Sequence, residues 1–215
     1  MIFYVLVAKP SMRLIWPVTA RLKKHRPATN NMLATRFLPI QDFHLYGDWL
    51  REKSPETLAT YFGIATSSTF INCLIDGILS NPEEHYFLVA TRGTKWAGVI
   101  HMARISERDM EFGIMVAEDE RNQGIADQLI EEAITWIRNR GFNTLYLHCL
   151  NRNAAMKHLA TKHGLDVHED HGDAEVATRI PPPSLLTYTQ EAVTNNKNIF
   201  FLNLQNLWAP YADLG

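Results

Sequence analysis

The sequence predicts one α/β domain with a mixed central sheet of about six to seven strands flanked by helices. The chain has 215 residues, of which 46% are hydrophobic, so it is long enough to bury a core. Short apolar runs alternate with segments whose apolar residues recur at helical spacing. The clearest helix is expected over 125–140, where one side carries Ile125, Leu129, Ala133 and Ile137 and where Gly141 follows as the stop.

The other elements follow from similar signals along the chain. Asp42 is the expected cap of the first helix, and Ser54 followed by Pro55 predicts the start of the second. Gly93 marks the turn of a hairpin. The expected strands are 36–40, 85–91, 95–105, 111–116, 144–150, 165–168 and 174–180. The expected helices are 42–53, a segment from 54 that breaks near 63–68, then 70–79, 125–140 and 153–163.

The two ends of the chain differ from its middle. Three prolines at 181–183 end the domain, because neither a strand nor a helix continues through them. We therefore expect a basic N-terminal extension over 1–33, the domain over 34–183 and a helical C-terminal extension over 184–215. Residues 1–36 carry seven basic side chains and no acidic one. They fit a targeting peptide, a solvated arm or added edge strand, or sequence upstream of a start at Met12 or Met32.

The C-terminal extension has a pattern of its own. We expect it to form an amphipathic helix that packs on the domain, because its apolar residues recur at helical spacing, at Phe200, Leu204, Leu207 and Trp208. Two functional alternatives stay open for this helix. It could close as a lid over the acceptor cleft, or it could form the contact of a homodimer.

Composition and spacing exclude several classes of function. A formal net charge of −2 disfavours a dedicated nucleic-acid binder. No apolar run approaches the ~20 residues that cross a bilayer, so we expect no membrane partner and a cytoplasmic protein. Cys73 and Cys149 form no disulfide or metal pattern, and the nine histidines match no zinc spacing. We therefore expect no metal site.

The most informative segment is 111–130, which predicts an apolar strand, a short turn, and a loop that opens an amphipathic helix. A helix start carries unpaired backbone N–H groups and the positive end of the helix dipole, so it attracts phosphate. Gly124 and Ala126 leave little bulk between those amides and an approaching diphosphate. Arg121 adds a delocalised positive charge. The segment therefore predicts a diphosphate site at the end of a strand.

The spacing Arg121-x-x-Gly124-x-Ala126 resembles the acetyl-CoA loop of the GNAT family of N-acetyltransferases. The run from Asn153 to Gly164 matches the next helix of that family, and the order of strand, loop, helix, strand and helix is the same. The resemblance is close over about 111–165. It implies the GNAT fold, acetyl-CoA as cosubstrate, and transfer of an acetyl group to a primary amine by direct attack in a ternary complex.

The resemblance also implies roles for particular residues. Backbone groups of Ile114, Met115 and Val116 would bind the pantetheine arm, which lies in the family between two diverging strands. Asn153 would lie near the cofactor arm, and it could equally be a plain helix cap. The loop would hold the pyrophosphate through the backbone N–H groups of Arg121, Asn122, Gln123, Gly124, Ile125 and Ala126.

The same resemblance implies a general base on the strand before the loop, and Glu111 occupies that position. Residues 111–116 together with Asn153 look most like the acetyltransferase domain of bacterial protein-lysine acetyltransferases. A free primary amine, with a pKa near ~10.4, must lose a proton before it attacks. We expect Glu111 to take this proton. The alternative for Glu111 is a surface position at the end of a strand.

The chain departs from the family pattern at two places. The usual tyrosine that protonates the leaving thiolate is replaced by Ala160, and Tyr146 or Tyr188 could substitute unless they are packing residues. The acidic residues at 118–120 lie beside the expected phosphate loop. They would weaken its attraction for CoA unless their side chains point outward.

These motifs do not define the acceptor. Tyr46, Trp49, Tyr61 and Phe62 could line an acceptor pocket or pack in the core, and His101 could border the site. A small-molecule amine and a protein amine therefore stay open. So do two other functions on the same scaffold, a non-catalytic acyl-CoA-binding sensory module and an interaction protein that has lost the ligand.

Overall fold

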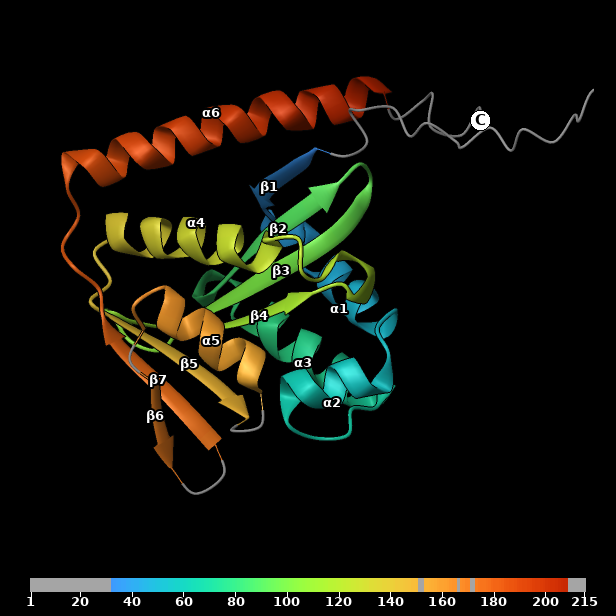
Figure 1. Ribbon diagram of the computed structural model, residues 1–215. Coiled ribbons are helices and arrows are strands. Elements are labelled where there is room, and N and C mark those ends of the chain that lie inside the picture. Colours follow the sequence, from blue (N-terminus) through green and yellow to red (C-terminus); the bar gives the residue numbers. More distant parts are fainter. Residues whose placement is uncertain (1–31, 151–152, 166, 171–172, 209–215) are drawn as a thin grey trace, which may run out of the picture.

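The computed structural model describes residues 32–150, 153–165, 167–170 and 173–208, and it confirms the α/β class. These residues form seven strands in the order β1-β2-β3-β4-β5-β7-β6, with helices on both faces of the sheet (Figure 1). The sheet is mixed, because β4 and β5 are parallel whereas the other neighbours are antiparallel. The strands are β1 (Leu33–Phe37), β2 (His85–Arg92), β3 (Lys95–Arg104), β4 (Asp109–Val116), β5 (Thr144–Leu150), β6 (Val167–Asp170) and β7 (Asp173–Arg179).

The described part of the chain also forms six α-helices and three short 3-10 turns. The helices are α1 (His44–Arg51), α2 (Pro55–Phe62), α3 (Ser68–Ser80), α4 (Ile125–Asn139), α5 (Ala154–Lys162) and α6 (Leu185–Trp208). The 3-10 turns are η2 (Ile40–Asp42), η3 (Pro82–Glu84) and η4 (Glu118–Glu120).

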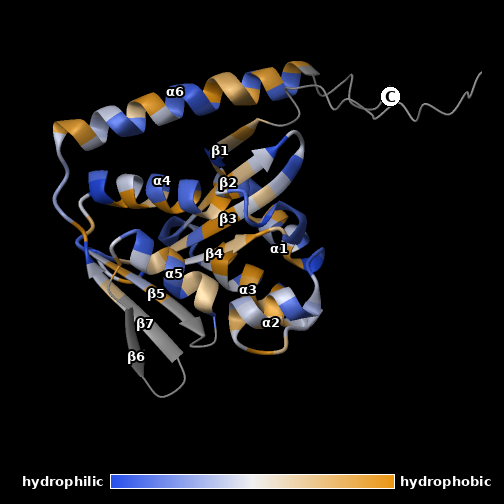
Figure 2. Ribbon diagram, viewed as in Figure 1, coloured by the Kyte–Doolittle hydropathy of each residue, from blue (hydrophilic) through white to orange (hydrophobic). Residues whose placement is uncertain are grey.

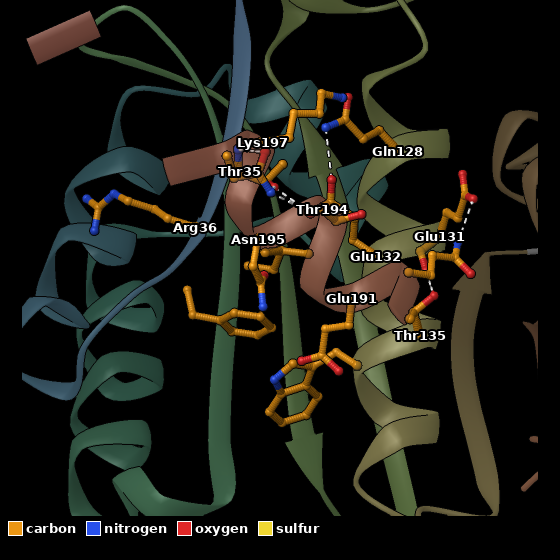
Figure 3. A pocket seen from close by; sticks show the side chains of 15 residues that line it. Thr35, Arg36, Gln128, Glu131, Glu132, Thr135, Glu191, Thr194, Asn195 and Lys197 are labelled. Atoms are coloured by element: carbon orange, nitrogen blue, oxygen red, sulfur yellow. Dashed lines mark hydrogen bonds between the residues drawn. The ribbon is translucent and has the colours of Figure 1, made fainter. Parts of the chain in front are cut away.

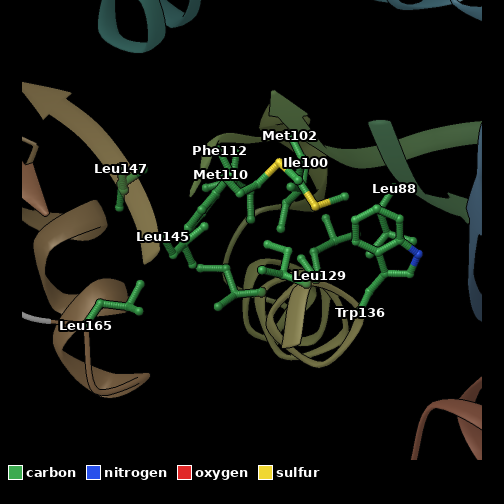
Figure 4. Close-up of a cluster of buried hydrophobic side chains, with 14 of the residues drawn as sticks. Leu88, Ile100, Met102, Met110, Phe112, Leu129, Trp136, Leu145, Leu147 and Leu165 are labelled. Atoms are coloured by element: carbon green, nitrogen blue, oxygen red, sulfur yellow. The ribbon is translucent and has the colours of Figure 1, made fainter. Parts of the chain in front are cut away.

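Two hydrophobic cores lie on opposite faces of the sheet, because successive side chains of a strand point to opposite sides. On one face, Leu88, Ile100 and Met110 pack with residues of α4 and α5 (Figure 4). On the other face, Phe87 and Val99 pack with residues of α1, α2 and α3. The sheet therefore separates two layers of helices.

Several boundaries agree with the sequence signals. Ser54 caps α2 by accepting a hydrogen bond from the Thr57 N–H at 3.2 Å, and Pro55 stands at the start of the helix. The bounds of β5 are those expected. In α4, the four residues expected on one side of the helix are all buried.

The first strand and helix differ from the prediction. β1 spans Leu33–Phe37 rather than the expected 36–40, and it ends early because the chain after Pro39 turns into η2 and leaves the sheet. Asp42 lies inside that turn. The N-cap of α1 is Phe43, which provides no side-chain cap. The predicted Asp42 cap is therefore wrong.

α6 packs on the domain, as expected, but its fully buried side chains are polar, and of the expected apolar residues Leu204 is half-buried. Figure 1 shows this helix along the side of the molecule that holds β1 and α4. Phe200 and Leu207, which we expected to face the domain, are 58% and 67% exposed. The surface beneath α6 is an edge strand and the outer side of α4, which presents Glu131 and Glu132. Polar side chains of α6 can bond to that surface. The buried polar residues of α6 are Thr187, Asn198 and Gln205.

A cavity of about 280 Å³ lies between β1, α4 and α6 (Figure 3). Its polar groups bind one another. Asn198 accepts a hydrogen bond from the Thr35 N–H at 3.3 Å and donates one to Thr35 Oγ1 at 2.5 Å. The Thr35 hydroxyl in turn donates to Glu132. These hydrogen bonds hold α6 against β1 and α4. We therefore interpret the cavity as part of the contact between α6 and the domain rather than as a ligand site.

The expectations for the ends of the chain are only partly tested. Residues 1–31 and 209–215 lie outside the described residues, so the division into 1–33, 34–183 and 184–215 stays a prediction. Within the described ranges, no helix is both long enough and apolar enough to span a membrane.

We predict that Asn198→Ala lowers the free energy of unfolding by about 1–3 kcal/mol, because the buried Thr35 N–H loses its acceptor. Urea denaturation followed by circular dichroism measures this difference. Asn195→Ala, at an exposed position of the same helix, is the matched control. Equal losses in the two variants would contradict the role given to Asn198.

Candidate functional site

β4 and β5 separate part way along their length. Their pairing ends at Glu111 and Tyr146, although β4 continues to Val116 and β5 to Leu150. A second cavity of about 280 Å³ lies in this part of the sheet. It is lined from both faces, by residues of α2, β3 and β4 on one side and of β4, β5 and α5 on the other. The lining residues are Thr60, Tyr61, Phe62, His101, Ala103, Glu111, Phe112, Gly113, Ile114, Leu147, Asn153 and Met156.

The backbone of β4 offers hydrogen-bonding groups to this gap. Arg108 O accepts from the Thr144 N–H of the neighbouring strand at 3.2 Å, whereas the Ala117 N–H donates to Ala97 O on the β3 side at 2.9 Å. Backbone groups alternate in direction along a strand, so the even-numbered residues face β5. Ile114 and Val116 therefore direct their N–H and C=O groups into the gap, whereas the backbone groups of Met115 face β3.

The loop after β4 leads to a helix start whose first amides are not capped by a side chain. Asn122 and Gly124 adopt the left-handed conformation, with φ of +60° and +76°. Gly124 is the N-cap of α4, and no side chain caps this end. The first N–H groups of α4 and the positive end of its dipole are thus available to an anion. The six loop residues expected to hold a pyrophosphate, 121–126, are together at this point.

The acids beside the loop are held by other groups. Glu118 accepts hydrogen bonds from the hydroxyls of Ser54 at 2.5 Å and Thr57 at 2.6 Å, and these bonds lower the pKa of Glu118 to about 2. Glu120 accepts from Arg92 Nε at 2.9 Å. Arg121 donates to Thr57 Oγ1 at 2.9 Å. Two of the three acids thus point toward α2 and Arg92, which reduces their repulsion of a phosphate.

Glu111 is half-buried in the gap and lies near the phenol of Tyr61. Gly113 makes this arrangement possible, because any side chain there would collide with the Tyr61 hydroxyl. Burial raises the pKa of Tyr61 to about 12; the hydrogen bond with Tyr46 opposes this shift and the charge of Glu111 adds to it. Tyr61 is therefore a neutral hydrogen-bond donor beside a carboxylate.

His101 stays neutral at physiological pH. Burial lowers its pKa to about 3, and the neighbouring His85 contributes to the shift. Its Nε2 lies 3.0 Å from His85 Nδ1, and its ring stacks on Phe87. Among the described residues that line the cavity, Glu111 is the only carboxylate. It is thus the acidic side chain of the cavity and the candidate proton acceptor.

Of the other residues considered for the site, Asn153 lines the cavity, whereas Ala160 and the two tyrosines do not. Asn153 both caps α5, by accepting from the Met156 N–H at 3.1 Å, and lines the cavity. Ala160 is fully buried in the core. Neither of the two tyrosines considered as its substitute is among the described lining residues: Tyr188, on α6, donates to Asn139 O at 3.2 Å, and Tyr146 pairs with Glu111 in the sheet.

Of the four aromatic residues considered for the acceptor pocket, Tyr61 and Phe62 line the cavity, as does His101. Tyr46 is buried behind Tyr61, and Trp49 is buried near Trp96. The sequence analysis considered Tyr61 for this pocket but did not place it against β4 or give it a proton-donor role. The available signal was Gly113, because a glycine inside a strand often marks a close approach of another group.

Comparison with known proteins gives a consistent assignment. The model of the acetyltransferase (GNAT) family matches residues 43–165, which is more than half of the chain. This range includes β4, the loop, α4 and α5. No match was found among curated proteins.

Solved structures of N-acetyltransferases have a similar fold. A GNAT-family acetyltransferase from Streptococcus pneumoniae is 21% identical, with a TM-score of 0.54, over 70% of this chain and 100% of that one. The GNAT domain of S. lividans PAT is 17% identical, with a TM-score of 0.55, over 67% and 89%. Spermidine N-acetyltransferase from Vibrio cholerae, solved with CoA and spermine, is 17% identical, with a TM-score of 0.54, over 69% and 95%.

The similarity to the GNAT domain of PAT and to the spermidine N-acetyltransferase is nearly equal, so it does not select an acceptor. At these identities the likeness establishes the fold, while the family match covers the loop and the strand that carry the site. The chain therefore belongs to the acetyltransferase (GNAT) family, whose members are N-acetyltransferases that use acetyl-CoA.

Proposed function

We propose that the protein transfers an acetyl group from acetyl-CoA to a primary amine by direct attack within a ternary complex. The observation that carries this proposal is the gap between β4 and β5. It opens toward the end of β4, where the uncapped start of α4 follows, and its wall includes Glu111. A phosphate-binding end and a carboxylate end are what a CoA-dependent transfer to an amine requires.

The loop and β4 would divide the binding of CoA between them. Backbone N–H groups at the start of α4 suit the pyrophosphate. The backbone groups of Ile114 and Val116 suit the amide-bearing pantetheine arm, which would lie along β4 like an added strand. Asn153 lines the same gap from the start of α5. When bound, acetyl-CoA supplies a thioester carbonyl that an amine can attack.

Glu111 would act as the base. The incoming ammonium gives up a proton to this carboxylate, directly or through one water, and its nitrogen then attacks the carbonyl carbon. A bond from nitrogen to the acetyl carbon forms, the nitrogen gives up its second proton toward the leaving sulfur, and the bond from the carbon to sulfur breaks. The electron pair leaves with CoA as a thiolate, which is a fair leaving group because a thiol has a pKa of about 8.5.

Tyr61 would supply the hydroxyl that Ala160 lacks. Among the described residues that line the gap it carries the only phenol. Its raised pKa keeps the hydroxyl protonated, so it can donate a hydrogen bond to the leaving sulfur. It would pass a proton to the sulfur only as it takes up the second proton of the attacking nitrogen. Phe62 and Phe112 make the rest of the pocket largely apolar. Such a pocket suits the alkyl stem of a small-molecule amine or of a protein amine.

We predict that Gly124→Glu raises the Kd for CoA at least about 10-fold, because a carboxylate at the start of α4 repels the pyrophosphate. Isothermal titration measures this Kd. Gly141→Glu is the matched control: both glycines have φ near +80° and open space around them, and Gly141 lies after the other end of α4. Equal weakening in both variants would argue against a phosphate site at Gly124.

We predict that Glu111→Gln lowers kcat about 10²- to 10⁴-fold while acetyl-CoA still binds with unchanged affinity. Thiol release is measured with an acceptor chosen from a panel of polyamines and lysine peptides. Glu107→Gln, at an exposed position before β4, is the control and should keep full activity. Binding of CoA without turnover in the wild-type protein would instead support the non-catalytic module.

We predict that Tyr61→Phe lowers kcat about 10- to 100-fold, since the ring keeps its packing while the proton donor is lost. The same assay applies, with CoA affinity as the second readout. Tyr188→Phe removes a phenol that bonds Asn139 outside the gap and should leave kcat unchanged. A larger loss in Tyr188→Phe than in Tyr61→Phe would overturn the assignment.

A further inference from the structure

The loop that leads to α4 has no apolar side chain that could hold it in place. Residues 118–123 are all hydrophilic, as Figure 2 shows. Within the loop, Asn122 adopts the left-handed conformation with φ of +60°, which costs free energy for a residue that carries a side chain. Polar contacts with neighbouring elements must therefore fix the position of this loop.

Two sets of polar contacts hold the loop from different sides. One set comes from α2 and holds Glu118 and Arg121. The other set comes from Arg92, the last residue of β2, whose Nε donates to the Glu120 carboxylate at 2.9 Å and whose Nη2 donates to Gln123 Oε1 at 3.0 Å. The Arg92 and Glu120 side chains are 12% and 18% exposed, so water screens their attraction little. One planar guanidinium thus bridges two residues of the loop.

Gln123 is the residue through which Arg92 acts on the loop backbone. It lies between Asn122 and Gly124, which both adopt the left-handed conformation. Its side chain is held at both ends, because Oε1 accepts from Arg92 and Nε2 donates to Asp119 O at 3.4 Å. These bonds keep the backbone N–H groups of the loop in their directions. Arg92 therefore preorganises the proposed pyrophosphate site without touching the ligand.

α6 supports the strand end that carries Arg92. Figure 1 shows the C-terminal part of this helix beside β1. The buried Gln205 donates to Met32 O at 2.9 Å and to Thr91 O at 3.4 Å, and the Thr91 hydroxyl donates to Gln205 Oε1 at 3.4 Å. The Gln205 amide therefore joins the start of β1 to the end of β2, one residue before Arg92. Loss of this joint would let the end of β2 move, and Arg92 with it.

We propose that Arg92 is a positioning residue for the phosphate loop and that α6, through Gln205, sets how tightly the protein binds CoA. This inference rests on the proposed function, because it takes the loop as the site of the pyrophosphate. Docking of α6 and binding of CoA are then coupled, and a coupling between two sites acts equally in both directions. CoA should therefore also hold the C-terminal part of α6 more firmly.

Substitutions of Arg92 separate the position of the guanidinium from its charge. Arg92→Lys keeps the charge but cannot bridge Glu120 and Gln123 as a planar fork does. Both Arg92→Lys and Arg92→Gln should raise the Kd for CoA about 10-fold in isothermal titration. Arg104→Gln removes a similar contact with Glu84 at the other end of the β2–β3 pair, and this matched control should keep the wild-type Kd. An unchanged Kd in Arg92→Lys would overturn the positioning role.

Backbone 15N relaxation of the free protein tests the support from α6 without a ligand. Gln205→Ala should lower the NMR order parameters of the amides at 122–126, because the end of β2 loses its joint. It should also raise the Kd for CoA at least about 5-fold. Asn198→Ala, which loses the anchor of α6 at Thr35, is the matched control and should leave both quantities unchanged. Equal effects in the two variants would overturn the role given to Gln205.

These measurements separate the failure of this inference from the failure of the proposed function. A wild-type protein that binds no CoA would contradict the proposed function. Unchanged order parameters of the loop in Arg92→Lys and Gln205→Ala would overturn the inference whether or not CoA binds. In the wild-type protein, CoA should slow hydrogen–deuterium exchange of the α6 amides around Gln205. Binding of CoA without any change there would overturn the coupling to α6.

Discussion

The separation of β4 from β5 is the constraint on which the rest of the site depends. A sheet of seven fully paired strands would isolate the two helical layers from each other. Because pairing ends at Glu111 and Tyr146, the remaining backbone groups of β4 have no strand beside them and a passage crosses the sheet. Phe112 and Ile114 line that passage from the α4 face, while Glu111 and Gly113 line it from the α2 face. A cosubstrate and an acceptor can thus approach from opposite sides.

α2 links the two ends of this passage. Its first turn holds Glu118 through Ser54 and Thr57, and Thr57 also accepts from Arg121 of the phosphate loop. Its last turn carries Tyr61, whose hydroxyl reaches Gly113. One short helix therefore fixes both the position of the loop and the position of the phenol. The same hydrogen bonds hold the Glu118 carboxylate against the start of α2, which reduces its repulsion of a phosphate at the loop.

The helix starts, the buried side of α4 and the phosphate loop were predictable from the sequence, because each depends on residues that are close together in the chain. The Ser54 cap, the apolar side of α4 and the loop before it depend on neighbouring residues, and the family resemblance follows from that loop. Contacts between distant residues were not predictable: Tyr61 meets Gly113 only because the fold brings α2 onto β4. The polar contacts of α6 were not predictable either, because the surface that receives Asn198 is formed by β1 and α4, which are distant in the sequence. The Asp42 cap failed because Pro39 redirects the chain beforehand.

The central claim is that the exposed edge of β4 binds the pantetheine arm of CoA. Hydrogen–deuterium exchange of the β4 amides, with and without CoA, tests it most directly. The account predicts slower exchange at the Ile114 and Val116 amides together with the first amides of α4. Met115 should change little, because its amide already faces β3. Protection of α4 alone, with the β4 amides exchanging as in the free protein, would contradict the claim.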